Sequence, residues 1–284
     1  MVETKPIGLV AGRDNLPFHV LTEIKRRNAK SVVIGLKGEV APGLAGKADV
    51  YREIEVGQIE TMLDFLKNEK VVDLVMAGKV GKRAIFEGRF DSRFQRLLQD
   101  LPEKNDDAVL LAVVAEFERN GFRVAKQTDY LQRLLAPSGA ILGQVTPREM
   151  EDLRLGFRMA KAIGDLDIGQ SVVVKEGVVL AVEAIEGTDE AIIRGGNLGG
   201  PGVIVVKVSK PKQDERFDVP TVGRTTIESM SKVKAGILGV EADKTLITEK
   251  EEMIALAREH NIKIIALDQF VLDSAGCSRS SDRV

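Results

Sequence analysis

Short apolar runs alternate with amphipathic segments through the first half of the chain. The runs are rich in valine, isoleucine and leucine, and they predict strands at residues 7–12, 31–36, 50–56 and 73–78. Apolar residues at helical spacing predict helices at residues 16–27, 59–67, 94–101 and 106–120. This alternation is typical of a parallel sheet covered on both faces. We therefore expect an α/β fold that begins with a Rossmann-like domain over residues 1–133.

The second half predicts a mixed α/β domain over residues 148–272. Thr146, Pro147 and Glu149 form a capping-box pattern, which predicts a helix from residue 147 to residue 163. The same patterns predict hairpins at residues 170–185 and 236–247, strands at 203–208 and 263–268, and helices at 226–235 and 250–259.

Residues 134–147 interrupt the periodicity with prolines and glycines, which predicts an interdomain linker. Gly139 and Gly143 are then the candidate hinge of that linker. The serine-rich end of the chain, residues 273–284, is expected to be a disordered tail.

Composition narrows the class of protein. The 284 residues are 44% hydrophobic and 30% charged, with a net charge of −2, which gives no electrostatic sign of nucleic-acid binding. Cys277 is the one cysteine and suits a reducing compartment. Since no run approaches the roughly 20 apolar residues of a membrane span, we expect a cytoplasmic enzyme or binding protein.

An acidic segment follows the first hairpin. Glu183, Glu186 and Asp189 lie within seven residues together with Thr188, near one end of the predicted sheet. Carboxylate and hydroxyl oxygens are ligands for hard cations, so the segment is a candidate site for Mg²⁺ or Mn²⁺ rather than zinc. The alternative is a solvated acidic loop that caps a helix starting near Asp189.

Two loops follow predicted strands of the first domain, at the edge where α/β sheets bind ligands. The first, residues 12–15, precedes a helix whose backbone N–H groups would suit an anion. The second carries Lys79 and Lys82 around a glycine and could meet phosphate. In both loops ordinary turn chemistry is the alternative. One carboxylate of the pair Asp106 and Asp107 is expected to cap the next helix, which leaves the other free for a role in catalysis or binding.

A charged loop spans residues 207–223. Four cations surround three acids there, and two prolines stiffen the backbone, which holds side chains in a fixed geometry. Lys210 and Lys212 supply positive charge for phosphate, and Asp218 could hold a metal or take a proton from water. The alternative is a salt-bridged crossover loop.

Taken in order, several motifs resemble the LpxI family of UDP-2,3-diacylglucosamine pyrophosphatases of lipid A biosynthesis. The resemblance covers residues 5–268, and its motifs are Gly12 with Leu16-Pro17, residues 76–80, residues 106–111 with 116–118, residues 167–177, residues 183–189 and residues 207–223. The Glu-Gly-Thr-Asp and Phe-Asp-Val-Pro-Thr-Val-Gly sequences are the specific ones.

The resemblance implies Mg²⁺-dependent hydrolysis of a UDP-linked diacylated glucosamine to UMP and 2,3-diacylglucosamine 1-phosphate, lipid X, with water attacking the sugar-side phosphorus. It implies a homodimer, two linked domains with lipid held between them, and contact with the surface of the inner membrane. Asp218 and Asp189 are then the catalytic candidates, and the acidic trio Glu183, Glu186 and Asp189 the metal ligands. The substrate-binding candidates are Gly12, Leu16, Lys79, Asp107, Gln170, Thr188, Lys210 and Lys212.

Two other classes of protein stay open. A Rossmann-type nucleotide-sugar oxidoreductase would fit the first domain, although residues 8–13 lack the full G-x-G-x-x-G spacing. A non-catalytic nucleotide-binding module is the third class, and the dense charge of the 207–223 loop argues against it. Retained cofactor absorbance favours the oxidoreductase, whereas metal-stimulated release of UMP favours the hydrolase.

Overall fold

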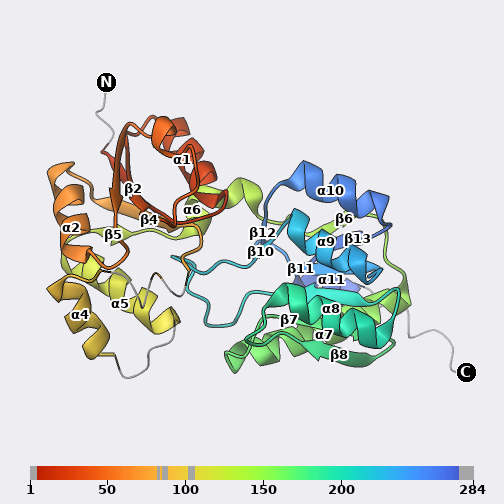
Figure 1. The fold of residues 1–284 in the computed structure, drawn as a ribbon. Coiled ribbons are helices and arrows are strands. Elements are labelled where there is room, and N and C mark those ends of the chain that lie inside the picture. The colour runs from red at the N-terminus through yellow and green to blue at the C-terminus, as the bar shows by residue number, and fades with distance from the viewer. Residues whose placement is uncertain (1–4, 82–83, 85–88, 102–105, 275–284) are drawn as a thin grey trace, which may run out of the picture. The chain divides into compact units, whose positions relative to one another are not determined.

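The computed structural model describes residues 5–81, 84, 89–101 and 106–274. These residues form two compact units (Figure 1). Unit 1 is the chain up to Gln132 together with the tripeptide Glu215–Phe217, and unit 2 is Arg133–Asp214 with the chain from Asp218 onward. Within the described chain, no helix combines the length and the apolar character that crossing a membrane requires.

Unit 1 is built on a five-stranded sheet of order β3-β2-β1-β4-β5, in which every neighbouring pair is parallel. Its strands are β1 (Ile7–Ala11), β2 (Ser31–Leu36), β3 (Val50–Ile54), β4 (Asp73–Ala77) and β5 (Arg123–Val124). This order is that of a Rossmann half, with the change of direction between β1 and β4. The predicted Rossmann-like domain is confirmed.

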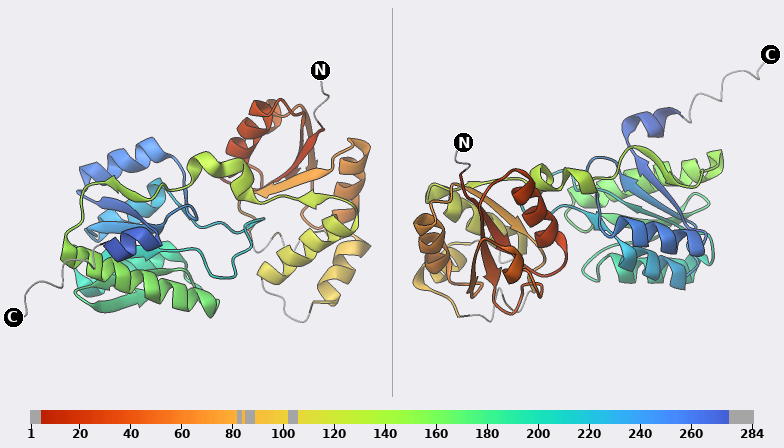
Figure 2. Two further views of the ribbon diagram at one scale, coloured as in Figure 1. Left: turned by 180° about the vertical axis from the view of Figure 1, so that it is seen from behind. Right: turned by 90° about the horizontal axis from the view of Figure 1, so that it is seen from above.

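Helices cover both faces of this sheet (Figures 1 and 2). They are α1 (Leu16–Arg26), α2 (Ile59–Asn68), α4 (Ser92–Gln99), α5 (Asp106–Arg119) and α6 (Gln127–Leu131), with a 3₁₀ turn η1 (Ala45–Lys47). Helices α2, α4 and α5 share one apolar cluster with Val10, Ile34 and Leu74 of the sheet. Helix α1 packs on β1, β2 and β4 and on α6.

The tripeptide Glu215–Phe217 belongs to unit 1 although unit 2 flanks it in the sequence. The Glu215 carboxylate forms an ion pair with Lys126 at 2.9 Å, and the Glu215 carbonyl accepts from the Gln127 N–H at 2.8 Å. Arg216 pairs with Glu118 at 2.9 Å, and Phe217 packs against the apolar cluster. The chain therefore passes from unit 2 into unit 1 and back within a few residues.

Unit 2 contains a mixed six-stranded sheet of order β6-β13-β11-β9-β7-β8. The central strands β9 (Ile204–Lys207), β11 (Ile237–Glu241) and β13 (Lys263–Leu267) are parallel. The outer strands β6 (Gly139–Leu142), β7 (Ser171–Lys175) and β8 (Val178–Val182) pair antiparallel with their neighbours, which confirms the hairpin predicted at residues 170–185. A small parallel pair, β10 (Thr221–Val222) and β12 (Leu246–Ile247), lies apart from this sheet.

Two apolar layers hold the unit 2 sheet between its helices. Helices α7 (Pro147–Asp165) and α11 (Gln269–Ser274) cover one face, and α8 (Thr188–Gly199), α9 (Arg224–Lys232) and α10 (Lys250–Glu259) cover the other. The capping box predicted at the start of α7 is present: Thr146 accepts from the Glu149 N–H, and Glu149 accepts from the Thr146 N–H. Gly156 of α7 lets the helix approach the sheet, because a Cβ there would lie 2.6 Å from Val206.

Residues 134–147 do not form the predicted linker. A 3₁₀ turn η2 (Gln132–Leu134) leads into β6, which pairs with β13 as an edge strand, and the Ala136 N–H donates to Thr245 at 2.9 Å. Gly139, expected with Gly143 as a hinge, is the first residue of this strand, with φ of +99°, and Gly143 follows the strand, with φ of +73°. Glycines that allow such angles at an edge strand give the same composition as a linker.

The predicted hairpin at residues 236–247 is also wrong. Strand β11 pairs with β9 and β13, whereas β12 pairs with β10, so the two arms do not pair with each other. The start of the predicted tail is ordered as well, since Asp273 and Ser274 lie in α11. The rest of that tail, including Cys277, lies outside the described residues.

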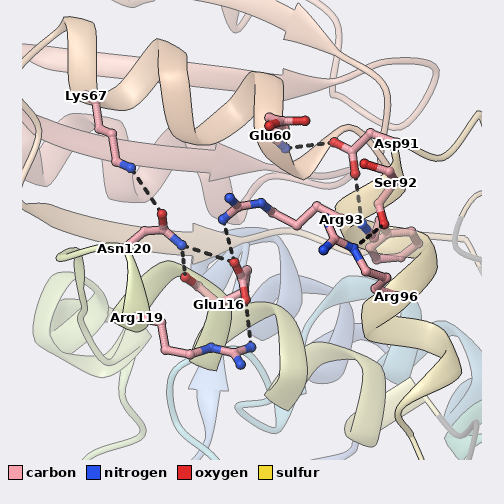
Figure 3. A network of polar contacts seen from close by, with 10 residues as sticks. Glu60, Lys67, Asp91, Ser92, Arg93, Arg96, Glu116, Arg119 and Asn120 are labelled. Carbon is pink, nitrogen blue, oxygen red and sulfur yellow. Dashed lines mark hydrogen bonds and ion pairs between the residues drawn. The ribbon is translucent and has the colours of Figure 1, made fainter.

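A mostly buried carboxylate, that of Glu116, ties α4 to α5 in unit 1 (Figure 3). Glu116, whose side chain is 13% exposed, accepts from Arg93 at 2.7 Å and from Arg119 at 2.6 Å. The Asn120 amide donates to it at 3.1 Å and accepts from Lys67. Glu116 thus links α4 to the end of α5, and Asn120 extends the contact to Lys67 of α2.

We expect Glu116→Gln to lower the free energy of unfolding of unit 1 by about 1–2 kcal/mol, because the neutral amide leaves two arginines without their carboxylate. Denaturant unfolding followed by circular dichroism measures the change. The matched control is Glu228→Gln, which removes an exposed pair with Arg224 and should change stability by less than about 0.5 kcal/mol. Equal effects of the two substitutions would contradict the role given to Glu116.

Candidate active site

The strand ends of unit 1 meet at the switch point between β1 and β4. Arg13 donates from its N–H to the Lys79 carbonyl at 2.8 Å, and the Lys79 N–H donates back to Arg13 at 3.1 Å. Gly12 is required there, because a Cβ would lie 2.5 Å from the Lys79 carbonyl oxygen. Gly78, with φ of +92°, makes the matching close approach to Arg13. Two loops that diverge in most doubly wound sheets are therefore bridged here.

The start of α1 does not offer the backbone donors that the sequence suggested for an anion. The Leu16 N–H donates to Asp14 Oδ1 at 2.9 Å, Pro17 has no N–H, and the Phe18 N–H donates to the Asn15 carbonyl at 3.1 Å. Burial raises the pKa of Asp14, which the positive charge of Lys79 partly offsets. The Leu16 side chain is part of the core.

The other candidates of unit 1 lie at separate places. Lys79 is exposed at the carboxyl end of β4, and Asp107 is half-buried in the first turn of α5. Lys82 and the side chain of Asp106 lie outside the described residues. The roles predicted for Lys79 and Asp107 remain predictions.

In unit 2 the structure brings three of the predicted residues together. Glu183 and Lys207, both 9% exposed, lie on either side of Ser171 at the same end of strands β8, β7 and β9. Thr188, the first residue of α8, donates to Glu183 Oε1 at 2.8 Å and accepts from Lys207 Nζ at 3.1 Å. The Gln170 N–H donates to Glu183 Oε2 at 3.3 Å. We call Gln170, Glu183, Thr188 and Lys207 the sheet-end cluster.

The acidic trio does not gather as the sequence suggested. Glu186 is hydrogen-bonded to Arg194, which lowers its pKa. Asp189 is exposed in the first turn of α8, while Glu183 is buried in the sheet-end cluster. Across the described residues no three His, Cys, Asp or Glu side chains form a group that could hold a metal. The trio therefore does not fit the predicted ion, and no chemical step is assigned to a metal held by it.

Asp218 lies at the end of a hydrogen-bonded chain of side chains. Gln213 Nε2 donates to Asp218 Oδ2 at 2.5 Å, and the Asp218 N–H donates to the Asp214 carbonyl at 3.0 Å. Gln213 Oε1 accepts from the Lys210 N–H at 2.7 Å and from Ser209 Oγ at 3.3 Å. The prolines of this loop thus act together with side-chain contacts in fixing its shape.

The two lysines predicted to bind phosphate are paired with acids near the end of α7. Lys210 contacts Asp167 at 2.6 Å, and Lys212 contacts Asp165 at 3.2 Å. Lys212 is 83% exposed, so its pairing is weak and easily exchanged for another anion. The salt-bridged interpretation of the loop is therefore present in the structure, and phosphate binding by the two lysines remains a prediction.

Sequence reasoning missed Lys161, Ser209, Gln213 and Glu241. The hairpin predicted at residues 236–247 puts Glu241 at its turn, whereas Glu241 ends a central parallel strand. Lys161 Nζ donates to both Glu241 carboxylate oxygens, at 3.1 and 3.0 Å, and to the Ser209 carbonyl at 2.8 Å. Recognising β11 as parallel would have marked its carboxyl end as a functional position.

Together the fold and the site define a two-unit α/β protein with a Rossmann-like unit and a polar strand-end site in a second, mixed unit. The chain belongs to the LpxI family: the model of the LpxI N-terminal domain matches residues 6–134, and that of the LpxI C-terminal domain matches residues 137–265.

A curated relative supports this assignment along nearly the whole chain. The UDP-2,3-diacylglucosamine pyrophosphatase LpxI of Caulobacter vibrioides is 32% identical over 281 residues, which cover 93% of this chain and 98% of that protein. By its name that relative hydrolyses a diphosphate bond. The resemblance inferred from the motifs is confirmed.

Solved structures give only distant likenesses. A biotin carboxylase domain of a single-chain bacterial carboxylase is 12% identical, with 49% of this chain and 36% of that one covered and a TM-score of 0.23. The biotin carboxylase domain of Hydrogenobacter thermophilus 2-oxoglutarate carboxylase is 16% identical, with coverages of 61% and 35% and a TM-score of 0.24. Scores this low carry no argument about fold or function.

Proposed function

We propose that this chain hydrolyses the diphosphate of UDP-2,3-diacylglucosamine to UMP and 2,3-diacylglucosamine 1-phosphate, lipid X, in lipid A synthesis. The observation that carries the proposal is the match of both LpxI domain models together with the pyrophosphatase relative over 93% of the chain. Membership of this family weighs against the oxidoreductase and the nucleotide-sensing alternatives.

Hydrolysis of a diphosphate needs charge neutralisation and a positioned water more than a covalent nucleophile. In the proposed reaction the water oxygen bonds to the sugar-side phosphorus, and the bond from that phosphorus to the bridging oxygen breaks, so that UMP leaves. Asp218 accepts the proton that the water loses. Lys207, Lys210 and Lys212 supply positive charge on the same stretch of chain.

Asp218 suits the role of base because its carboxylate is half-buried and held by a neutral donor. A carboxylate that is hydrogen-bonded to a neutral amide remains available as a proton acceptor, whereas a carboxylate ion-paired with arginine would not. Thr188 and Gln170 of the sheet-end cluster then orient the substrate. Asp189, exposed in the first turn of α8, is a second candidate for contact with the phosphates or their counterions.

We expect Asp218→Ala to lower kcat for UMP release by at least about 10²-fold, the usual effect of losing a catalytic base, with substrate affinity largely retained. The matched control is Asp273→Ala, which removes a carboxylate that also accepts from a glutamine amide, Gln269, in unit 2. It should leave kcat unchanged. More than a tenth of the wild-type rate in Asp218→Ala would contradict the proposal.

The proposal includes a requirement for a divalent cation, Mg²⁺ or Mn²⁺. Exhaustive chelation should reduce UMP release by about 10²-fold, because a cation contributes several kcal/mol to a phosphoryl transition state. Added Mg²⁺ should restore the rate, and full activity after chelation would contradict the requirement.

Asp189, an exposed acid of the first turn of α8, is tested separately from that requirement. If Asp189 helps to hold the cation, Asp189→Asn raises the Mg²⁺ concentration for half-maximal activity, whereas Glu190→Gln, a change at the next exposed acid of the same helical turn, does not. Equal Mg²⁺ dependence of the two variants and the wild type would exclude Asp189 from the cation site.

Two properties of the assembly complete the proposal. We expect a homodimer, and transient contact with membrane surfaces because the substrate carries two acyl chains. Sedimentation at micromolar concentration measures the first, and co-flotation with phospholipid vesicles measures the second. A monomer, or a protein absent from the vesicle fraction, would contradict the corresponding property.

A further inference from the structure

We propose that Gln213 is a positioning residue that orients the Asp218 carboxylate for reaction. This inference rests on the proposed function, since it assumes that Asp218 is the catalytic base. Its starting point is the 2.5 Å hydrogen bond from Gln213 Nε2 to Asp218 Oδ2. That contact is the end of a chain of hydrogen bonds that begins in the sheet of unit 2.

The contacts of Gln213 fix which end of its amide faces Asp218. The Lys210 backbone N–H, 2.7 Å from Oε1, can only donate, so it requires the carbonyl oxygen of the amide. The ionised Asp218 carboxylate can only accept, so it requires the nitrogen. Both requirements are met by one amide orientation, and the reverse orientation would place two like groups in contact at each end.

Ser209 connects this amide to the core of unit 2. Its hydroxyl lies 3.3 Å from Gln213 Oε1, and its N–H donates to Glu241 Oε2 at 2.9 Å. Ser209 itself is buried. Glu241, at the end of β11, is held in turn by Lys161 of α7. The chain therefore runs from a strand end and a helix through Ser209 and Gln213 to Asp218.

The Asp218 side chain needs such a restraint. Its backbone is fixed by the hydrogen bond from its N–H to Asp214, but the half-buried side chain retains rotamers that point elsewhere. A base must be held within roughly 0.5 Å of its productive position. Gln213 supplies such a restraint by donating to one of the two carboxylate oxygens.

Two substitutions at Gln213 separate positioning from simple support of the loop. Glutamate has the shape of glutamine and keeps an oxygen for the Lys210 N–H and Ser209, but it loses the donor and places a negative charge against Asp218. Alanine loses all three contacts. If Gln213 only supports the loop, Gln213→Glu retains activity and stability, and Gln213→Ala loses both.

We expect both variants to lose at least about tenfold in kcat, because displacement of a catalytic group by about 1 Å can cost 10²-fold. KM should stay within about threefold of the wild type, since an interaction acting on the chemical step changes kcat rather than uniform binding. Gln213→Glu should lose at least as much kcat as Gln213→Ala, with a smaller loss of melting temperature because it keeps two of the three contacts. Gln269→Ala, which removes an equivalent glutamine–carboxylate contact in α11, should match the wild type.

The assay is UMP release from UDP-2,3-diacylglucosamine, with Asp218→Ala and wild type run in parallel. If wild type is active and Asp218→Ala is not, a kcat within twofold of wild type in Gln213→Glu overturns the positioning role and leaves the proposed function intact. The positioning role is also overturned if only Gln213→Ala loses kcat and that variant loses melting temperature in parallel. Absence of UMP release by the wild type would overturn the proposed function and, with it, this role of Gln213.

Discussion

Parallel pairing of β-strands is the constraint on which the rest of this structure depends. A parallel neighbour cannot be reached by a tight turn, so the chain must cross back over a face of the sheet, and helices supply most of these crossings. Both faces are then covered, and polar side chains gather where the strands end. Gly12 and Gly78 occupy such ends in unit 1, and Lys207 and Glu241 occupy them in unit 2.

The unit 2 site contains two kinds of charged pair, and the free energy needed to separate them differs. Glu183 and Lys207 are buried and share Thr188, so separating them would leave charged groups poorly solvated. Lys212 and Asp165 are exposed, and an exposed pair contributes at most about 1 kcal/mol. The unit 2 site therefore combines a buried charged pair with an exposed lysine whose pairing is weak.

The sequence predicted most of the parallel unit because β1, β2 and β4 are apolar runs and the longer helices have clear periodicity. It did not predict the two-residue β5 or the short α6. It failed where short segments depend on distant partners. A four-residue edge strand that begins at Gly139 and is followed by Gly143 has the composition of a linker. The turn after Glu241 resembles that of a hairpin until β9 and β13 are known to flank β11.

The candidate site was predicted in part for a related reason. The Glu183–Thr188 contact follows from residues close in sequence. Glu186 and Asp189 are equally close, yet Arg194 engages the first and the start of α8 leaves the second exposed. Residues that are close in sequence at a strand-to-helix turn therefore need not have side chains that are close in space. Gln213 carries no sequence signal at all, because a single amide belongs to no local pattern and gains its role from Ser209, Lys210 and Asp218.

Because of the tripeptide Glu215–Phe217, the structural units of this chain do not coincide with continuous stretches of its sequence. The two family domains meet between residues 134 and 137, yet three residues from the later one complete the earlier one. A gene fragment ending at residue 134 would encode unit 1 without Phe217 in its apolar cluster and without the partners of Lys126 and Glu118. Recombination at that junction would therefore separate halves that are contiguous on the gene but interlaced in the protein, so the two halves are expected to be inherited together.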